Sequence, residues 1–278
     1  MNGVSDRSRF DRILIEADDL STLDPMQVQH TVEGNGLACI RGLHSRSEVQ
    51  TTLRRIRERF DASNDRKHDP ADTEAVRGNL QKLQIGANSG VNSMRTLGRF
   101  MRAIYNPIFA DDVLGMRNDF IRLARLRNRL YGLADDFAVT GTQEGFWTCS
   151  RLLQYPAGGG FMVPHRDVYS QLATTSADLG YYQLLMLMTE QGRDYDEGGG
   201  YVDHDGYRFR YEPFTHAGDV IVYDGRSIHG VADVDPMSEL ELQRFTGRVV
   251  ALVSLFRYLL PGTDAYGVMS TEGGSRFT

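Results

Sequence analysis

The sequence predicts a mainly β fold, a double-stranded β-helix (jelly roll) core buttressed by N-terminal α-helices. Two observations carry this prediction. From Phe146 onward, short β-rich runs alternate with glycine-rich turns, which is typical of an antiparallel sandwich or barrel. Before Phe146, apolar residues recur at helical spacing. We expect a single domain over residues 1–278, with a mixed helical elaboration over 1–145, a jelly-roll core over 146–260 and a tail over 261–278.

Two segments of the first half have helical spacing. The first follows a short apolar run over 36–42 that suits a buried strand. Ser45 and Glu48 match a capping box, and four apolar residues then form one stripe: Val49, Leu53, Ile56 and Phe60. The second predicted helix spans about 112–133. Most of its arginines lie off the apolar stripe, so we expect them on a solvated face: Arg117, Arg122, Arg125, Arg127 and Arg129.

Between these helices, residues 61–95 are polar and interrupted by glycine and proline, which predicts a long excursion with little regular structure. Loops of this length often serve as lids or binding segments. Asn88, Asn92 and Arg95 can contact a charged substrate from such a loop, and loop surface is the alternative for each of them.

The second half carries the predicted strands: Phe146 to Tyr155, Tyr181 to Thr189, Tyr201 to Val202, Tyr207 to Tyr211, Asp219 to Tyr223 and Arg248 to Tyr258. Residues 203–206, Asp-His-Asp-Gly, read as a hairpin turn. Since a jelly roll pairs strands that are distant in sequence, it can bring together side chains from both ends of this region.

Composition argues against several classes of protein. The formal net charge of −6 argues against a nucleic-acid partner, because neutralising phosphates requires a basic surface. No stretch approaches the ~20 apolar residues of a membrane span, and the N-terminus lacks a signal-peptide core. We therefore expect a cytoplasmic protein, and the oligomeric state stays open. Cys39 and Cys149 lie in apolar runs, so we expect buried free thiols rather than a disulfide framework.

Three residues have side chains of the types that bind metal ions in proteins. His165 and Asp167 lie two apart just after Pro164, where a strand would begin, so that both side chains point to one face. His229 follows a segment, 218–228, that reads as a turn, an apolar strand and a second turn. Two imidazoles and one carboxylate can hold a ferrous ion on one side and leave the opposite positions free. Arg248, further along, is the type of residue that anchors a dicarboxylate.

These motifs resemble those of the Fe(II)/2-oxoglutarate-dependent dioxygenases. Residues 155–167, YPAGGGFMVPHRD, are similar to the strand that carries the first two metal ligands in that family. Residues 218–231 resemble the family's G-D segment leading to the second histidine, and the glycine turn at 197–200 resembles that of the intervening hairpin. Residues 247–248, Gly-Arg, resemble its co-substrate site. The resemblance covers roughly 146–258, under half of the chain.

The resemblance implies a role for each matching residue. The iron ligands would be His165, Asp167 and His229. Arg248 would form a bidentate pair with the distal carboxylate of 2-oxoglutarate, a planar match that lysine reproduces poorly. Tyr155 would donate its hydroxyl to the same carboxylate.

The chain departs from the family pattern after His229. The interval to Arg248 is long and contains an acidic insertion over 233–243. The position two after the arginine, often Ser or Thr in the family, is Val250. Arg244 is therefore a rival for the anchoring role.

The resemblance extends more faintly to a branch that acts on small natural products and includes halogenases. Those halogenases replace the carboxylate ligand with Gly or Ala, whereas this chain has Asp167 there. We therefore expect hydroxylation or a related C–H oxidation of a small molecule, such as an amino acid or natural-product intermediate, with Fe(II), 2-oxoglutarate and O2. The alternatives are a peptide or protein hydroxylase and a non-oxidative, cupin-like metal-binding protein.

The other histidines are expected to have no role in the site. His204 and His216 lie in polar, hairpin-like segments and are expected to face solvent. His30, His44 and His68 precede the β region and are expected on the surface.

Overall fold

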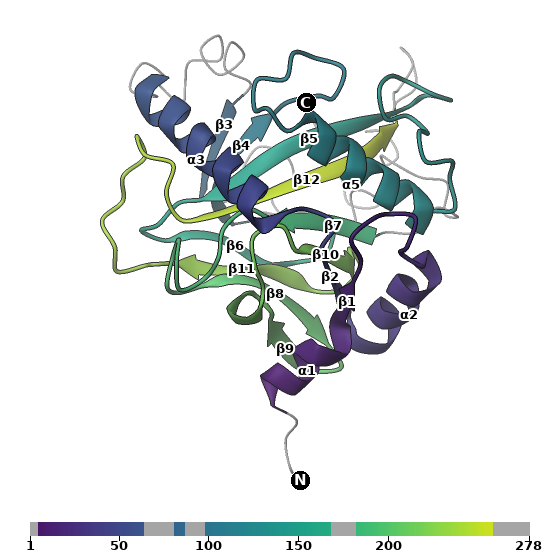
Figure 1. Ribbon diagram of the computed structural model, residues 1–278. Coiled ribbons are helices and arrows are strands. Elements are labelled where there is room, and N and C mark those ends of the chain that lie inside the picture. Colours follow the sequence, from purple (N-terminus) through teal and green to yellow (C-terminus); the bar gives the residue numbers. More distant parts are fainter. Residues whose placement is uncertain (1–4, 64–80, 87–97, 168–181, 258–278) are drawn as a thin grey trace, which may run out of the picture.

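The computed structural model describes residues 5–63, 81–86, 98–167 and 182–257 (Figure 1). Of the expected polar excursion, Asn88, Asn92 and Arg95 lie outside the described residues, as do His68 and the predicted tail. Within these ranges, no helix combines the length and hydropathy needed to cross a lipid bilayer.

The predicted jelly roll is confirmed by the strand order. One wall pairs four strands in the order β5 (Phe146–Tyr155), β12 (Arg248–Arg257), β7 (Tyr182–Leu187) and β10 (Val220–Asp224). The second wall has the order β6 (Gly160–His165), β11 (His229–Val234), β8 (Gly199–His204) and β9 (Tyr207–Arg210). The chain passes from one wall to the other, so each wall is built from strands distant in sequence. The predicted turn joins β8 to β9, with positive φ angles of 49° and 75° at Asp205 and Gly206.

Strands from the first half of the chain complete the sheet. β4 (Arg99–Tyr105) pairs with both β5 and β6 and so connects the two walls, and β3 (Gln81–Gly86) pairs with β4. At the other edge, β2 (Leu37–Arg41) pairs with β10, and β1 (Leu14–Glu16) runs parallel to β2. β4 was missed because its interior residues are buried on both faces, which removes the alternation that identifies a strand.

Three helices in the described part of the chain cover the outer face of the first wall: α2 (Pro25–Asn35), α3 (Arg46–Ser63) and α5 (Arg117–Leu130). α1 (Asp6–Ile13) instead buries Phe10 and Ile13 in a second cluster of apolar residues. α3 begins where the sequence predicts, and three stripe residues are buried: Val49, Leu53 and Ile56. α5 is shorter than expected. The Asp112 carboxylate accepts the amides of Met116 and Arg117, at 2.9 and 3.2 Å, ahead of the helix. Gly132, with φ of 67°, follows its end.

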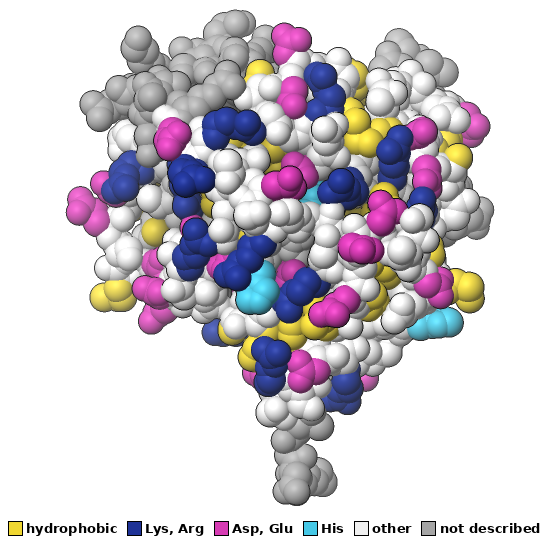
Figure 2. Space-filling view, viewed as in Figure 1, with side chains coloured by type: hydrophobic (Ala, Val, Ile, Leu, Met, Phe, Trp, Pro, Cys, Tyr) yellow, Lys and Arg dark blue, Asp and Glu magenta, His cyan; other side chains and the backbone are white. Residues whose placement is uncertain are grey.

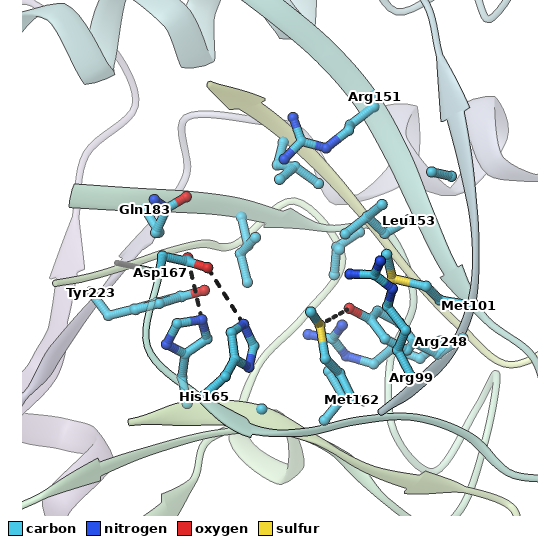
Figure 3. Close-up of a pocket in the computed structure, with 18 of the residues that line it drawn as sticks. Arg99, Met101, Arg151, Leu153, Met162, His165, Asp167, Gln183, Tyr223 and Arg248 are labelled. Atoms are coloured by element: carbon cyan, nitrogen blue, oxygen red, sulfur yellow. Dashed lines mark hydrogen bonds and ion pairs between the residues drawn. The ribbon is translucent and has the colours of Figure 1, made fainter. Parts of the chain in front are cut away.

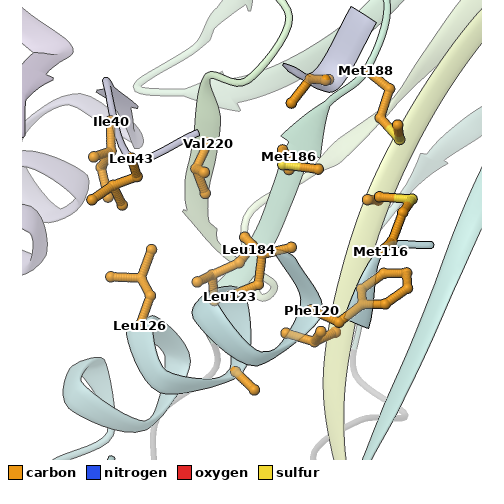
Figure 4. Packing of buried hydrophobic residues seen from close by; sticks show 14 of the residues in the cluster. Ile40, Leu43, Met116, Phe120, Leu123, Leu126, Leu184, Met186, Met188 and Val220 are labelled. Atoms are coloured by element: carbon orange, nitrogen blue, oxygen red, sulfur yellow. The ribbon is translucent and has the colours of Figure 1, made fainter. Parts of the chain in front are cut away.

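The main core lies between α5 and the first wall (Figure 4). Phe120, Leu123 and Leu126 of α5 pack in the same cluster as Leu184 and Met186 of β7. Because strand side chains alternate between faces, the intervening residues of the same strands point into the jelly roll. On the face toward the helices, the side chains of the first wall are therefore apolar, whereas the face toward the interior of the jelly roll can hold polar side chains.

Two sequence-based expectations about surface residues are wrong. His44 is only 4 % exposed, and its Nδ1 lies 2.8 Å from Oδ1 of Asp119 on α5. Arg127 is 1 % exposed, and its Nη2 donates to the Asn128 side chain at 2.7 Å. Burial lowers the pKa of Arg127 to about 10. Both errors arise because α5 is covered on more than the face that its apolar stripe marks.

Basic and acidic side chains are mixed on the face of the molecule that Figure 2 shows. Glu190, just after β7, ties α3 to the sheet. Its buried carboxylate accepts from Arg46 Nε at 2.7 Å, from the Gln50 amide at 2.9 Å and from the Ala217 backbone at 3.0 Å. Burial alone would raise the pKa of Glu190, but these donors, Arg46 first, lower it to about 2. The carboxylate therefore stabilises the folded state above its unfolded pKa of 4.5, and this stability is lost as the pH falls toward 2.

Glu190→Gln is expected to lower the free energy of unfolding by about 2 kcal/mol near neutral pH, because Arg46 loses its charged partner. The deficit relative to wild type is expected to shrink by more than half by about pH 3. Urea unfolding of both proteins at the two pH values measures this. A deficit that does not change with pH would contradict the assignment.

Candidate metal centre

The interior of the jelly roll contains a cavity of 390 Å³ (Figure 3). Alternate residues of the first wall and β4 line one side, as the period of two requires. They are Arg99, Met101, Ala103, Tyr105, Arg151, Leu153, Tyr155, Gln183, Leu185, Arg248, Val250 and Leu252. Residues at the ends of β6 and β11 line the opposite side.

Strand pairing brings the two expected metal-binding histidines together. β6 and β11 are antiparallel, and His229 is the direct partner of His165 in their register. The strand that the sequence placed after Pro164 in fact ends at His165, so Asp167 lies two residues beyond it. The Asp167 backbone amide donates to Gly225 at 2.7 Å, which holds the carboxylate over the two imidazoles.

The ligand atoms of His165, Asp167 and His229 all lie within 4.8 Å of one another. Nε2 of His165 is 3.5 Å and Nε2 of His229 is 3.3 Å from an oxygen of Asp167. Among the described residues, this is the one group of three or more His, Cys, Asp or Glu side chains that is placed to hold a metal ion.

Hydrogen bonds to the backbone orient both imidazoles. Nδ1 of His165 lies 2.9 Å from the Val163 carbonyl, and Nδ1 of His229 lies 2.9 Å from the Ser227 carbonyl. A carbonyl only accepts, so Nδ1 carries the proton and Nε2 keeps a free lone pair in the neutral ring. Two nitrogen donors and one carboxylate thus converge from one side, a donor set that fits ferrous iron.

The surroundings keep Asp167 charged. Burial opposes ionisation of Asp167, but hydrogen bonds from Nε2 of His165 and His229, when those nitrogens carry a proton, outweigh it and lower the pKa of Asp167. A bound metal ion would take the place of those protons. Tyr223 packs on His229, with ring centroids 4.7 Å apart. Burial, followed by the charge of Asp167, raises the pKa of Tyr223 well above its ordinary value, so its hydroxyl stays neutral.

Arg248 lies at another side of the cavity and has a buried acidic partner. Its Nε and Nη2 both lie 2.6 Å from Oε1 of Glu212, and the two side chains are 2 % and 3 % exposed. Glu212 also accepts from the Tyr195 hydroxyl and, at 2.8 Å, from the Gly200 amide. Burial would lower the pKa of Arg248, but Glu212 raises it, so the guanidinium is charged and held in a fixed orientation.

The structure separates the two candidate anchors. Arg248 lines the cavity, and the ring of Tyr155 lies 5.2 Å from its guanidinium carbon. Burial raises the pKa of Tyr155 to about 12, so its hydroxyl stays protonated. In this structure the hydroxyl donates to Met162 Sδ at 3.7 Å. Arg244 is exposed, pairs with Glu241 at 3.0 Å and does not line the cavity.

Comparison with known proteins identifies the fold. No family model and no curated protein matches the sequence. Among solved structures, a prolyl 4-hydroxylase from Pseudomonas putida superposes with a TM-score of 0.50 at 16% identity, over 85% of this chain and 100% of that chain. The chain has the fold of this prolyl 4-hydroxylase.

Two further structures are similar at lower scores. A Trichoplax adhaerens prolyl hydroxylase in complex with a hypoxia inducible factor peptide is 11% identical, covering 84% of this chain and 89% of that one, with a TM-score of 0.47. The epimerase SnoN, in complex with Fe3+, alpha ketoglutarate and nogalamycin RO, is 14% identical, covering 91% and 95%, with a TM-score of 0.46. At these identities the likeness concerns the oxygenase fold alone.

Within the oxygenase fold, three charged residues of the site were not found from the sequence. Arg151 shares the inward face of β5 with Tyr155, so alternation along that strand could have identified it. Arg99 belongs to the missed strand β4. Glu212 belongs to no recognised sequence motif, and its contact with Arg248 forms only in the folded structure. His204 and His216 are half-buried rather than fully exposed to solvent, and neither lies within the group of His165, Asp167 and His229.

Proposed function

We propose that the protein is an oxidoreductase that couples the oxidative decarboxylation of 2-oxoglutarate to C–H oxidation, in the first place hydroxylation, of a small molecule. The observation that carries this proposal is the convergence of His165, Asp167 and His229 on one side of a cavity that also contains a buried, charged arginine. The three ligands would hold iron(II), and their free coordination side would face the cavity.

When bound, iron(II) would activate O2 with electrons supplied by 2-oxoglutarate, which would leave as succinate and CO2, so that an unactivated C–H bond can be oxidised. The chain supplies orientation and a sheltered space. The backbone carbonyls of Val163 and Ser227 hold the imidazoles in the metal-binding tautomer. Apolar wall residues, such as Leu153 and Val250, limit the access of water to the reacting atoms.

Arg248 is the proposed partner of the distal carboxylate of 2-oxoglutarate. Glu212 and Tyr211 occupy its Nε and Nη2, while Nη1 has no partner among the residues described and is left for a ligand. The neutral hydroxyl of Tyr155 can donate to the same carboxylate. Glu212 thus fixes the guanidinium without using all of its donors.

A small molecule fits this cavity better than a peptide segment does. Its volume of 390 Å³ falls at the lower end of the ~300–1,000 Å³ range of small-ligand pockets. A cupin-like protein without oxygen chemistry would have no use for a buried arginine beside the metal ligands.

The proposed activity is tested by loading the purified protein with iron(II), adding 2-oxoglutarate and O2, and measuring succinate with and without pools of small organic acids, amino acids and peptides. Succinate that depends on all three additions supports the oxygenase. If stoichiometric iron binding gives no succinate with any pool, the protein is a metal-binding protein of another kind.

Arg248→Lys is expected to raise the KM for 2-oxoglutarate about 10- to 100-fold, because an ammonium keeps the charge but loses the planar fork. Arg244→Gln, at the rival position, is expected to leave this KM unchanged, since Arg244 lies outside the cavity. Initial rates of succinate formation over a range of 2-oxoglutarate concentrations give both values. The opposite pattern would assign the anchor to Arg244.

A further inference from the structure

The charges on the cavity wall do not cancel. Three arginines and one carboxylate line it: Arg99, Arg151, Arg248 and Asp167. Glu212 neutralises Arg248 from behind. An iron(II) ion with Asp167 would carry one net positive charge, which the carboxylate next to the keto group of 2-oxoglutarate would balance. Among the described residues, Arg99 and Arg151 then remain without a carboxylate partner, and the distal carboxylate of 2-oxoglutarate can balance only one of them.

Arg99 lies at the same end of the cavity as the proposed 2-oxoglutarate anchor. It is the register partner of Met162, whose sulfur accepts the Tyr155 hydroxyl. Burial lowers the pKa of Arg99, and the groups that oppose this shift are the tyrosines Tyr105 and Tyr155. No carboxylate in the described part of the chain pairs with Arg99, so its charge can share the distal carboxylate with Arg248.

Arg151 lies too far along β5 to do the same. Arg248 is paired with Tyr155, whereas Arg151 is paired with Leu252 and Tyr105. The four residue steps from position 151 to position 155 correspond to about 13 Å of strand. The two carboxyl carbons of 2-oxoglutarate are joined by four C–C bonds of ~1.5 Å and are at most ~6 Å apart. One molecule therefore does not reach from the Arg248 end to Arg151.

The side chain of Arg151 is held in place without a compensating charge. Its Nη1 donates to the Ser254 hydroxyl at 3.2 Å and lies 3.8 Å from Cys149 Sγ, and both partners are neutral. Across the residues that the structure describes, no carboxylate contacts Arg151. It enters the cavity on the side away from Arg248 and Met162 (Figure 3). Its neighbours in the cavity wall are Tyr105 and Leu252, which pair with it across the adjacent strands. Phe256 lines the cavity further along β12.

We propose that Arg151 binds a carboxylate of the primary substrate, and that the substrate is a monocarboxylic acid whose apolar or aromatic body lies against Leu252 and Phe256. A single unpaired guanidinium matches a singly charged carboxylate better than a doubly charged phosphate. That this ligand is the molecule being oxidised rests on the proposed function; that the site binds an apolar acid does not.

The test is isothermal titration calorimetry with matched pairs of arylalkyl carboxylic acids and their primary amides, beginning with 3-phenylpropanoate and 3-phenylpropanamide. Each pair is titrated into the metal-free protein and into protein loaded anaerobically with iron(II) and 2-oxoglutarate. We expect at least one acid to bind at least about tenfold more tightly than its amide. Arg151→Gln should remove this preference, and Arg151→Lys should retain part of it. Arg54→Gln, which removes an exposed arginine of α3, should leave it intact.

The proposal is overturned if no acid in the series is preferred over its amide, or if the preference survives in Arg151→Gln. These results are separable from failure of the oxygenase. If the protein prefers acids but forms no succinate, the carboxylate site is retained and the oxygenase proposal is rejected. If the protein forms succinate but does not prefer acids, the oxygenase proposal is retained and the carboxylate site is rejected.

Discussion

Asp167→Ala is expected to weaken iron(II) binding at least about 100-fold and to bring succinate formation to the background rate. Loss of a group that merely orients a ligand already costs about 10- to 100-fold in metal affinity, and Asp167 is the charged ligand itself. The two remaining donors are neutral imidazoles held in register by β6 and β11. They can retain weak metal binding but cannot balance the charge of the ion.

Anaerobic calorimetry with iron(II), together with succinate formation, measures this effect. Asp233→Ala is a matched control, because Asp233 is an exposed aspartate on β11 and is not part of the ligand group. The control should bind iron as wild type does. Stoichiometric, tight iron binding by Asp167→Ala would remove this residue from the metal centre.

Glu212→Leu is expected to destabilise the protein by about 3–5 kcal/mol, because it leaves the charge of Arg248 buried without a partner. It should also weaken 2-oxoglutarate binding, since the long contact with the Tyr211 hydroxyl, at 3.4 Å, then replaces a charged partner in holding the guanidinium. The double variant Glu212→Leu/Arg248→Met replaces the ion pair with apolar side chains and should recover most of the stability. It should not recover 2-oxoglutarate binding.

Urea unfolding and calorimetry with 2-oxoglutarate separate the two roles of this pair. Stability that returns in the double variant while binding stays lost would mean that the pair is kept for the co-substrate rather than for folding. If the double variant is as unstable as Glu212→Leu, the ion pair is needed for folding. If the double variant binds 2-oxoglutarate normally, the anchor of the co-substrate lies elsewhere.

Local patterns in the sequence were sufficient to predict the jelly roll and to select three residues, His165, Asp167 and His229, that the structure brings together. β5 begins and ends at the predicted residues, because a β-rich run there is bounded by glycine-containing turns. The predicted strand before His229 corresponds to β10, whereas β11, which begins at His229, was not predicted. Period-two alternation places His165 and Asp167 on one face, although the strand ends between them.

Interactions that form only in three dimensions were not predictable in the same way. Glu212 and Arg248 are 36 residues apart, and neither the 3-10 turn around Glu212 nor its neighbours signal an ion pair. The burial of His44 and Arg127 depends on how α5 sits against its surroundings. The apolar stripe of a helix predicts one buried face but does not predict contacts on the rest of the helix surface.

The first wall serves both the helix-packed core and the cavity, one on each face, and this constrains how such a protein can evolve. Leu152 faces the helix-packed core, whereas Arg151 and Leu153, its neighbours on β5, line the cavity. Insertion or deletion of one residue within β5 would exchange these two faces for the rest of the strand, moving cavity side chains under the helices. Substitutions at alternate positions, by contrast, alter one face and spare the other. Lineages of this fold can therefore change substrate by substitution within the strands and vary in length only in the connections between them.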